Sequence, residues 1–502
     1  METGTGLIVL AVLALLVLIS LTLDVYQCTV VSKSGLALLI GGLVGLVMST
    51  EDPAAATSLD FNHSLFFAVL LPPIIYEAGF SVERTTFFRN FGAIVATAIW
   101  GTFISACVTG LMLYVASASE WIPQVDWVEA FLFGAVLSAV DPVATLASFQ
   151  KLHVSPVLFN VVFGESVLND AVAIALYKAV SRATSLPMLI LVVIETFGIL
   201  VGSICVAMLM TLMGSALFMT IPTLRAFPTY EVLLSMSVSL STYFVADAFE
   251  FSGIVALFFS GILTAHYHFH IMSPVAQLVF HHVLVTAAFV SEILVYIFVG
   301  VATALILKGS SPLQYELSWS FVGLTTLSLF VGRFLNVFPL VALTNRFKCN
   351  QDTITPRMMI VMWLAGLRGA VAVALVMDWS YIRPDGTDRK ALMVTTTLFV
   401  VIGTTWIVGG LTGPLVRLCG LVDETSSAPD RTVTPMGRRM SSIDLDVSAD
   451  GRCAKARVLL HKMWTNFDET YMKPFFGGRR RKSFHDKVSG SLLDHVIAST
   501  ED

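Results

Sequence analysis

The sequence predicts an all-α membrane protein with about 13 transmembrane helices. Two observations carry this prediction. Hydrophobic residues make up 56% of the chain and charged residues only 13%, whereas soluble domains carry about 25% charged residues. Runs of about 20 apolar residues, each long enough to cross a bilayer as a helix, recur between positions 7 and 418. Turn-forming sequences such as STEDPAAATS and IPTLRAFP separate the runs.

The apolar runs place the expected spans in order. The first run has no basic segment before it and no small-residue cleavage site after it, so we expect a retained helix rather than a signal peptide. The six cysteines are scattered without a CxxC motif, which argues against a disulfide framework or a zinc site. The expected spans are 7–23, 33–50, 62–80, 91–116, 128–150, 156–181, 187–218, 229–248, 251–271, 282–307, 317–343, 356–378 and 391–418.

The composition changes near residue 423 and divides the chain into two parts. Residues 1–422 form the predicted transmembrane domain, and residues 423–502 form a polar tail. Of the 30 Lys and Arg residues, 13 follow residue 430. Because positive charge favours the cytosolic side, we place this basic regulatory tail in the cytosol. An odd number of spans then puts the N-terminus on the opposite side.

The tail contains two kinds of candidate regulatory sequence. The stretch CAKARVLLHKMWTNFDETYMKPFF is either an amphipathic helix on the inner leaflet or part of a solvated, disordered tail. The GRRRK run at 478–482 would favour anionic lipid. Ser441 and Ser483 follow basic residues, so phosphorylation there is a candidate switch.

Two interrupted spans occupy matching positions in the two halves of the domain. Six spans precede the long seventh and six follow it, and the fifth span of each half carries a helix-weakening sequence. These sequences are SAVDPVATL, around Asp141-Pro142, and AGLRGAVAV, around Gly366, Arg368 and Gly369. Such breaks in two repeats indicate a transporter site at the midplane, with the seventh span inverting the second repeat. The alternative is a pair of ordinary kinks in a helical bundle.

Ionisable residues inside the spans point to the chemistry. Each costs about 3 kcal/mol at a helix centre, so each is a functional hypothesis. Acids outnumber bases eight to two, an excess that suits a cavity which attracts cations and exchanges protons. The residues are Glu77, Asp141, Glu165, Asp170, Glu195, Asp247, Glu250, Glu292, Arg333 and Arg368.

Asp170, in the motif FGESVLND, is the sharpest candidate for an ion-binding carboxylate. A carboxylate in a half-wet cavity can hold either a proton or a cation such as Na⁺ or K⁺, and the two compete. Asn169 and Ser166 supply further oxygens, and Ser166 shares a helix face with Asp170. One acid beside a neutral amide suggests one proton for one monovalent cation, which is electroneutral exchange. The alternatives are a buried structural acid here and, for the whole protein, a passive cation or proton channel.

The other buried charges divide into pairs and cavity candidates. Glu165 and Arg368 are expected to form a structural ion pair, because an unpaired buried arginine is costly. Asp141 either lines the cavity or caps the half-helix that follows it, and Pro142 at the first helical position would suit the capping role. Asp247 is either a cavity acid or a polar residue at a span end.

Three further features are less specific. Glu292 and Arg333 could form a second internal pair. The histidines of HYHFH (His266, His268 and His270) could sense pH, bind a metal, or simply occupy an interfacial loop. An intramembrane hydrolase is not expected, because GES is not a nucleophile elbow and HYHFH lacks the HExxH arrangement. We expect no enzymatic activity, no cofactor beyond the transported ions, and no nucleic-acid partner.

Five motifs together resemble the Na⁺/H⁺ exchanger branch of the cation/proton antiporters. They are FFAVLLPPIIYEAGFS, FGAVLSAVDPVATLASF, FGESVLNDAVAIAL, FSGIVALFFSGI and AGLRGAVAVAL, in the order and at the spacing of that branch. The resemblance covers most of residues 60–375. Within the branch, SAVDPVATLASFQKLHV looks most like the eukaryotic endomembrane-type exchangers, which favours a Golgi, endosomal or related membrane over the plasma membrane.

The resemblance carries further expectations. It implies a homodimer in which a dimerisation domain supports a mobile core domain. It implies that Asp170, beside Asn169, carries the ion and the proton, and that Asp141 belongs to the unwound crossing. It also implies the bridge between Arg368 and Glu165, and it aligns Asp247 with an acidic cavity residue. Exchange of Na⁺, K⁺ or both for H⁺ would regulate pH and cation content.

Overall fold

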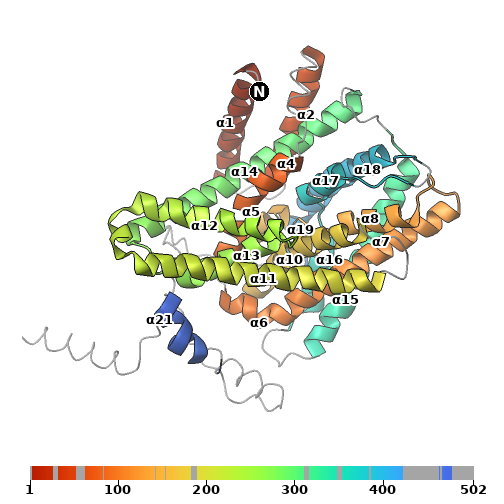
Figure 1. The fold of residues 1–502 in the computed structure, drawn as a ribbon. Helices are drawn as coiled ribbons and strands as arrows, with labels where there is room; N and C mark the ends of the chain where they lie inside the picture. Colours follow the sequence, from red (N-terminus) through yellow and green to blue (C-terminus); the bar gives the residue numbers. More distant parts are fainter. Residues whose placement is uncertain are drawn as a thin grey trace, which may run out of the picture.

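The computed structural model shows a bundle of helices (Figure 1). In the part of the chain that the structure describes, every regular element is helical. The described residues are 3–26, 32–51, 63–82, 84–141, 143–152, 154–181, 189–309, 316–346, 353–383, 386–421, 463 and 466–476.

The first half of the domain contains six helical units. They are α1 (Thr3–Val25); α2 (Lys33–Glu51); α4 (His63–Leu65) continued by η1 (Phe66–Leu70) and α5 (Leu71–Ser81); α6 (Arg84–Val95) continued by η2 (Ala96–Trp100) and α7 (Gly101–Ala118); the pair α8 (Trp127–Ser138) and α9 (Val143–Lys151); and α10 (Pro156–Ser181).

The long α11 separates the two halves and is followed by the second half. The elements of this part are α11 (Leu189–Thr220) with η4 (Pro222–Ala226); α12 (Pro228–Ala248); α13 (Gly253–Leu263) continued by η5 (Thr264–His268); α14 (Pro274–Lys308); α15 (Trp319–Arg346); the pair α16 (Pro356–Leu364) and α17 (Ala370–Met377); and α18 (Lys390–Gly403) continued by η6 (Thr404–Val408) and α19 (Gly409–Leu418). In the tail, η8 (Asp468–Met472) is followed by α21 (Lys473–Phe476).

These elements correspond in order to the apolar runs of the sequence. Among the described residues, nine helices are long and apolar enough to cross a membrane. The other expected runs coincide with α12, with α13 and η5, and with the two interrupted pairs α8–α9 and α16–α17. The prediction of an all-α membrane protein is confirmed. The division of the chain at residue 423 stays a prediction, and Ser441, Ser483 and the 478–482 run lie outside the described residues.

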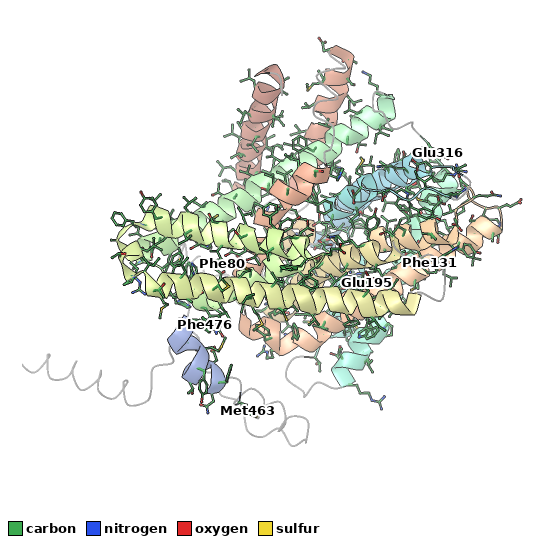
Figure 2. All side chains as sticks on the ribbon, in the orientation of Figure 1. Phe80, Phe131, Glu195, Glu316, Met463 and Phe476 are labelled. Atoms are coloured by element: carbon green, nitrogen blue, oxygen red, sulfur yellow. The ribbon has the colours of Figure 1, made fainter. Side chains whose placement is uncertain are left out.

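The outer helices present apolar side chains to the surroundings. Leu7, Leu10 and Leu18 of α1 are more than half exposed, and α1 projects from the body of the bundle (Figures 1 and 2). A helix that is apolar on all faces and still exposed suits contact with lipid.

The helices pack into two groups. In one group α2 lies along α14, and α13 lies along α5. Gly41 of α2 faces the Ile297 backbone, and Gly300 of α14 faces the Leu38 carbonyl, so closely that a Cβ at either glycine would overlap the other helix. Small residues that allow such close approach are typical of helix packing in membranes. In the second group α7 packs against α8 and α15, and α10 packs against α6 and α8.

The two interrupted spans meet each other at their breaks. The first break separates α8 from α9, and the second separates α16 from α17. The backbone N–H of Asp141 donates to the Leu367 carbonyl at 3.0 Å, which joins one break to the other. The prediction of interrupted spans at matching positions is therefore confirmed. Pro142 lies outside the described residues, so its capping role stays a prediction.

Candidate functional site

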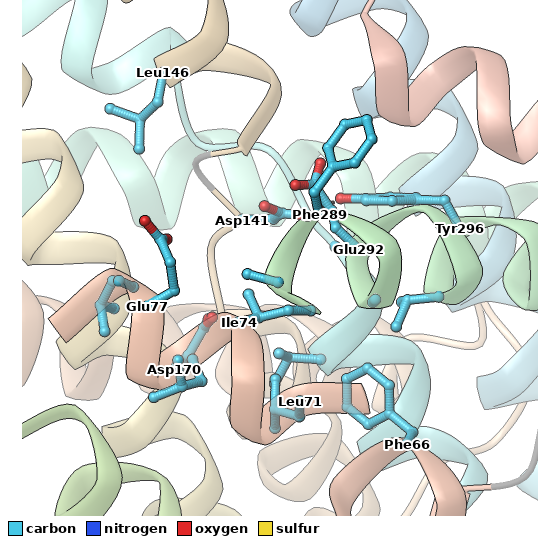
Figure 3. A pocket seen from close by; sticks show the side chains of 18 of the residues that line it. Phe66, Leu71, Ile74, Glu77, Asp141, Leu146, Asp170, Phe289, Glu292 and Tyr296 are labelled. Atoms are coloured by element: carbon cyan, nitrogen blue, oxygen red, sulfur yellow. Dashed lines mark hydrogen bonds between the residues drawn. The ribbon is translucent and has the colours of Figure 1, made fainter. Parts of the chain in front are cut away.

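A cavity of about 290 Å³ lies where α5, α10 and α14 face the two breaks. Most of its wall is apolar, but four carboxylates line it, from Glu77, Asp141, Asp170 and Glu292 (Figure 3). The described residues that line the cavity include no lysine and no arginine. A cavity with carboxylates and low-dielectric walls concentrates cations.

Asp170 occupies the part of this wall that α10 contributes. The helix starts at Pro156, a residue suited to the first helical position. From Gly164 to Tyr177 every residue of α10 is buried. The Asp170 side chain is 8% exposed, and its buried Oδ1 accepts no hydrogen bond from the described residues. A buried acceptor without a donor is costly, so this oxygen fits a group that takes up a proton or a cation.

Asn169 and Ser166 hold the first break in place. Asn169 Oδ1 accepts the Val140 N–H at 3.0 Å, and its Nδ2 donates to Thr102 Oγ1 at 2.8 Å. The Ser166 hydroxyl donates to the Val140 carbonyl. Neither side chain is among the residues that line the cavity. The sequence placed both as ion ligands, whereas here their polar atoms satisfy the backbone that the unwound segment leaves free.

Asp141 lines the cavity, which is one of the two roles that the sequence left open, and its capping of the following half-helix stays a prediction. It accepts a hydrogen bond from the Tyr296 hydroxyl of α14 (Figure 3). Its side chain also lies directly against Gly369, where any Cβ would overlap the carboxylate. The glycine is needed here for close approach, because the second break must pass over Asp141.

Arg368 binds backbone carbonyls at the first break. Its Nη1 donates to the carbonyls of Ser138 and Ala139 at 3.0 and 2.9 Å, and its backbone N–H donates to Thr404 Oγ1 at 3.2 Å. These carbonyls end α8, where the helix dipole concentrates negative charge. A fully buried arginine is thus stabilised by a helix terminus.

The predicted pair of Glu165 with Arg368 is wrong. Glu165 instead pairs with Arg333 of α15, whose two terminal nitrogens each donate to one carboxylate oxygen. Arg333 also donates to the Met362 carbonyl in the last turn of α16 at 3.1 Å. The suggested pair of Arg333 with Glu292 is wrong for the same reason. The sequence argument assumed that a buried arginine needs an acid, but carbonyls at a helix end also satisfy one.

Asp247 is not a cavity residue in this structure. It lies in the last turn of α12, its side chain is 56% exposed, and it faces Lys178 Nζ of α10 at 3.5 Å. The cavity wall does not include it. Of the two positions that the sequence allowed, a polar residue at a span end is the one observed.

The histidines of HYHFH do not converge on one site. His268 is buried between Ser215 and Ser235, with its Nε2 2.8 Å from the Ser235 hydroxyl. His266 faces Asp468 of the tail. In the described part of the chain no group of three or more His, Cys, Asp or Glu could hold a metal.

Sequence reasoning undervalued two residues of the cavity wall. Glu77 was named only in the list of ionisable residues inside the spans, although its carboxylate lines the cavity. Tyr296 was not singled out at all. The available signal was its spacing from Glu292, since two polar residues four apart in an apolar run share one helix face.

Comparisons with known proteins agree on one family. The family model described as sodium/hydrogen exchanger, transmembrane, matches residues 7–418. The chain is 34% identical over 502 residues to sodium/hydrogen exchanger 8 of Rattus norvegicus, covering 95% of this chain and 85% of that protein. It is 33% identical over 466 residues to sodium/hydrogen exchanger 5 of Arabidopsis thaliana, covering 88% and 87%.

A solved structure shares the fold. The sodium proton antiporter MjNhaP1 from Methanocaldococcus jannaschii at pH 8 matches with a TM-score of 0.60 and 18% identity, covering 83% of this chain and 100% of that chain. The likeness extends over nearly the whole helical bundle and shows that this chain has the antiporter fold.

Proposed function

Because this chain belongs to the sodium/hydrogen exchanger family and exchanges Na⁺ for H⁺ across a membrane, we propose that Asp170 is the carboxylate at which the two ions compete. The observation that carries this proposal is the buried Oδ1 of Asp170, which accepts no hydrogen bond from the described residues and belongs to a residue of the cavity wall. Family membership favours coupled exchange over the passive channel, and the relatives are named as exchangers rather than as enzymes.

The surroundings of Asp170 support exchange of one charge for one charge. Asn169 beside it is a neutral amide that is engaged with the backbone, so it adds no second titrating group. Asp141 accepts the Tyr296 hydroxyl and lines the same cavity, so it places a second carboxylate near the ion. A single proton on Asp170 would then replace one Na⁺ or K⁺, and the cycle would be electroneutral.

We further propose that the site changes sides when one helix group moves against the other. The cavity supports this, because α5 and α14 form one part of its wall while α10 and the two breaks form the other. Relative displacement of these groups would expose Asp170 to each side in turn. The family resemblance supports a homodimer that is held together by the non-moving group.

Three finer assignments rest on the sequence. The tail is placed in the cytosol by its basic composition, where GRRRK would contact anionic lipid and regulators could bind. The motif around Asp141 favours an endomembrane such as the Golgi or an endosome. Potassium is proposed as a second transported cation, since carboxylate and carbonyl oxygens accept either alkali ion.

The test compares two Asp→Asn variants in proteoliposomes that contain a pH-sensitive dye. Asp170→Asn should abolish Na⁺-driven proton movement, because the amide cannot exchange a proton. Asp247→Asn is the matched control, since it makes the same chemical change outside the cavity and should retain wild-type flux. Clamping the membrane potential should leave wild-type exchange unchanged. Wild-type flux in a folded Asp170→Asn protein would refute the assignment.

A further inference from the structure

The described part of the tail is docked on the transmembrane domain. Residues 466–476, here named the tail helix, pack against α11 and η5. Figure 1 shows α21 beside the bundle, and Figure 2 labels Phe476 at the end of this segment. The contact requires the tail and the connection from η5 to α14 to lie on one side of the membrane. In the predicted topology the connection follows the ninth span and the tail follows the thirteenth. Because four spans lie between them, both are expected on the same side of the membrane.

The centre of the contact is the Asp468 carboxylate. Asp468 is only 5% exposed, and three groups hold it. The Tyr267 hydroxyl donates to Oδ1 at 2.7 Å, His266 Nε2 lies 3.3 Å from Oδ2, and Lys473 Nζ lies 3.3 Å from Oδ2. Two of the three partners belong to η5, so the carboxylate joins the tail to the transmembrane domain.

We propose that this contact is a pH-dependent latch, in which protonated His266 holds the tail helix against η5 and neutral His266 releases it. The latch concerns regulation by the tail and does not depend on the assignment of Asp170. Imidazole is the side chain that ordinarily changes charge between about pH 5 and 8. A cationic ring beside a buried carboxylate makes a charge-assisted hydrogen bond, which is stronger than the bond made by a neutral ring.

Asp468 itself does not supply the pH dependence. Burial alone would raise the pKa of this carboxyl, but the Tyr267 hydrogen bond and the charges of His266 and Lys473 outweigh burial and lower the pKa below 3.8. When docking lowers the pKa of an acid, the charged acid stabilises docking at any pH above the pKa of the undocked acid. This stabilisation is lost only as the pH falls through the lower pKa of the docked state. Between pH 6 and 8 Asp468 therefore stays charged, and the change comes from the imidazole.

Among the described residues, the helices packed against η5 carry few other charges. The α13 helix carries no ionisable residue, and the described parts of α5 and α11 carry one acid each, Glu77 and Glu195. Glu77 accepts the Ser81 hydroxyl and lines the cavity. The end of α11 that contacts η5 carries Thr211 and Ser215, so Glu195 lies toward the other end; Figure 2 shows it well away from the tail helix.

The other histidine of η5, His268, has different partners. His268 lies between Ser215 and Ser235, and neither serine is among the groups that hold Asp468. Lys473, on the tail helix itself, contacts the Asp468 carboxylate from the same segment and so does not join the tail to η5. His266 is thus the group whose charge differs between the docked and released conditions.

Hydrogen exchange on the full-length protein in nanodiscs tests the latch. After correction for intrinsic exchange rates, amides of residues 466–476 should be protected at pH 6 and about tenfold less protected at pH 8, the order expected for one partly exposed charge-assisted bond. His266→Gln should make protection independent of pH. His270→Gln, in the same connection, is the matched control and should keep the wild-type response.

A second variant separates docking from folding. Asp468→Asn changes only the tail, so protection of α11 should be unchanged while protection of 466–476 falls at both pH values. The proposal is overturned if the wild-type segment shows equal protection at pH 6 and 8, or none at either pH. It is also overturned if His266→Gln retains the pH response.

Discussion

Replacing Glu165 with glutamine perturbs the buried ion pair at the centre of the bundle. The change removes the negative charge and leaves the Arg333 guanidinium buried, with the Met362 carbonyl as an acceptor and no partner at Nε among the described residues. Removing one member of a buried pair costs roughly 3–5 kcal/mol. Because glutamine keeps the volume and one acceptor oxygen, we expect the lower value, a loss of about 3 kcal/mol in the free energy of unfolding.

The assay is denaturant unfolding of purified protein in detergent, with double variants that identify the partner. Glu165→Gln combined with Arg333→Met leaves neither charge and should recover most of the lost stability. Glu165→Gln combined with Arg368→Met is the comparison; it keeps Arg333 unpaired, frees the Ser138 carbonyl, and should be less stable than either single variant. Recovery with Arg368→Met instead of Arg333→Met would refute the pairing seen here.

Three other changes test the walls of the cavity and its break. Gly369→Ala would place a Cβ inside the Asp141 carboxylate; we expect a severalfold loss of folded protein in size-exclusion chromatography, and a normal yield would contradict the close crossing. Tyr296→Phe removes the donor to Asp141 and should change the apparent affinity for Na⁺ more than the maximal rate, so an unchanged concentration dependence would count against a role at the site. Asn169→Asp adds an acid but loses the donor to Thr102; a lower melting temperature is expected, with a membrane current in the surviving protein, and the absence of any current would weaken the stoichiometry.

The sequence predicts most of the fold because the solvent is lipid. In lipid the backbone N–H and C=O groups of an apolar run must bond to each other, which a helix allows. The positions of the spans therefore follow from the positions of the apolar runs. The two breaks follow from Asp141-Pro142 and from Gly366 and Gly369, which weaken helices for known reasons. Asp170 stands out as a candidate because an acid in such a run needs a special environment.

The sequence does not predict which polar groups meet. Glu165 and Arg368 have opposite charges and both lie in apolar spans, so the sequence suggested that they pair. In the structure Arg333 donates to the Glu165 carboxylate, whereas Arg368 donates to backbone carbonyls, which every residue carries. Asn169 illustrates the same limit, because its engagement with Val140 depends on where a helix unwinds. Contacts to main-chain atoms leave no pattern in side-chain identity, so they emerge only from coordinates.

A broken helix is usually regarded as a place where a protein bends, but the crossing in this bundle is braced. The Arg368 guanidinium donates to a carbonyl at the end of α8, and the Asn169 amide oxygen accepts a hydrogen bond from the segment that follows α8. A main-chain hydrogen bond from Asp141 joins this segment to the break between α16 and α17. Local flexing at these points would rupture several buried bonds together. The part of the protein that moves during a transport cycle should therefore contain both breaks as one rigid body. The bending should occur in the loops that connect the helices at the membrane surface.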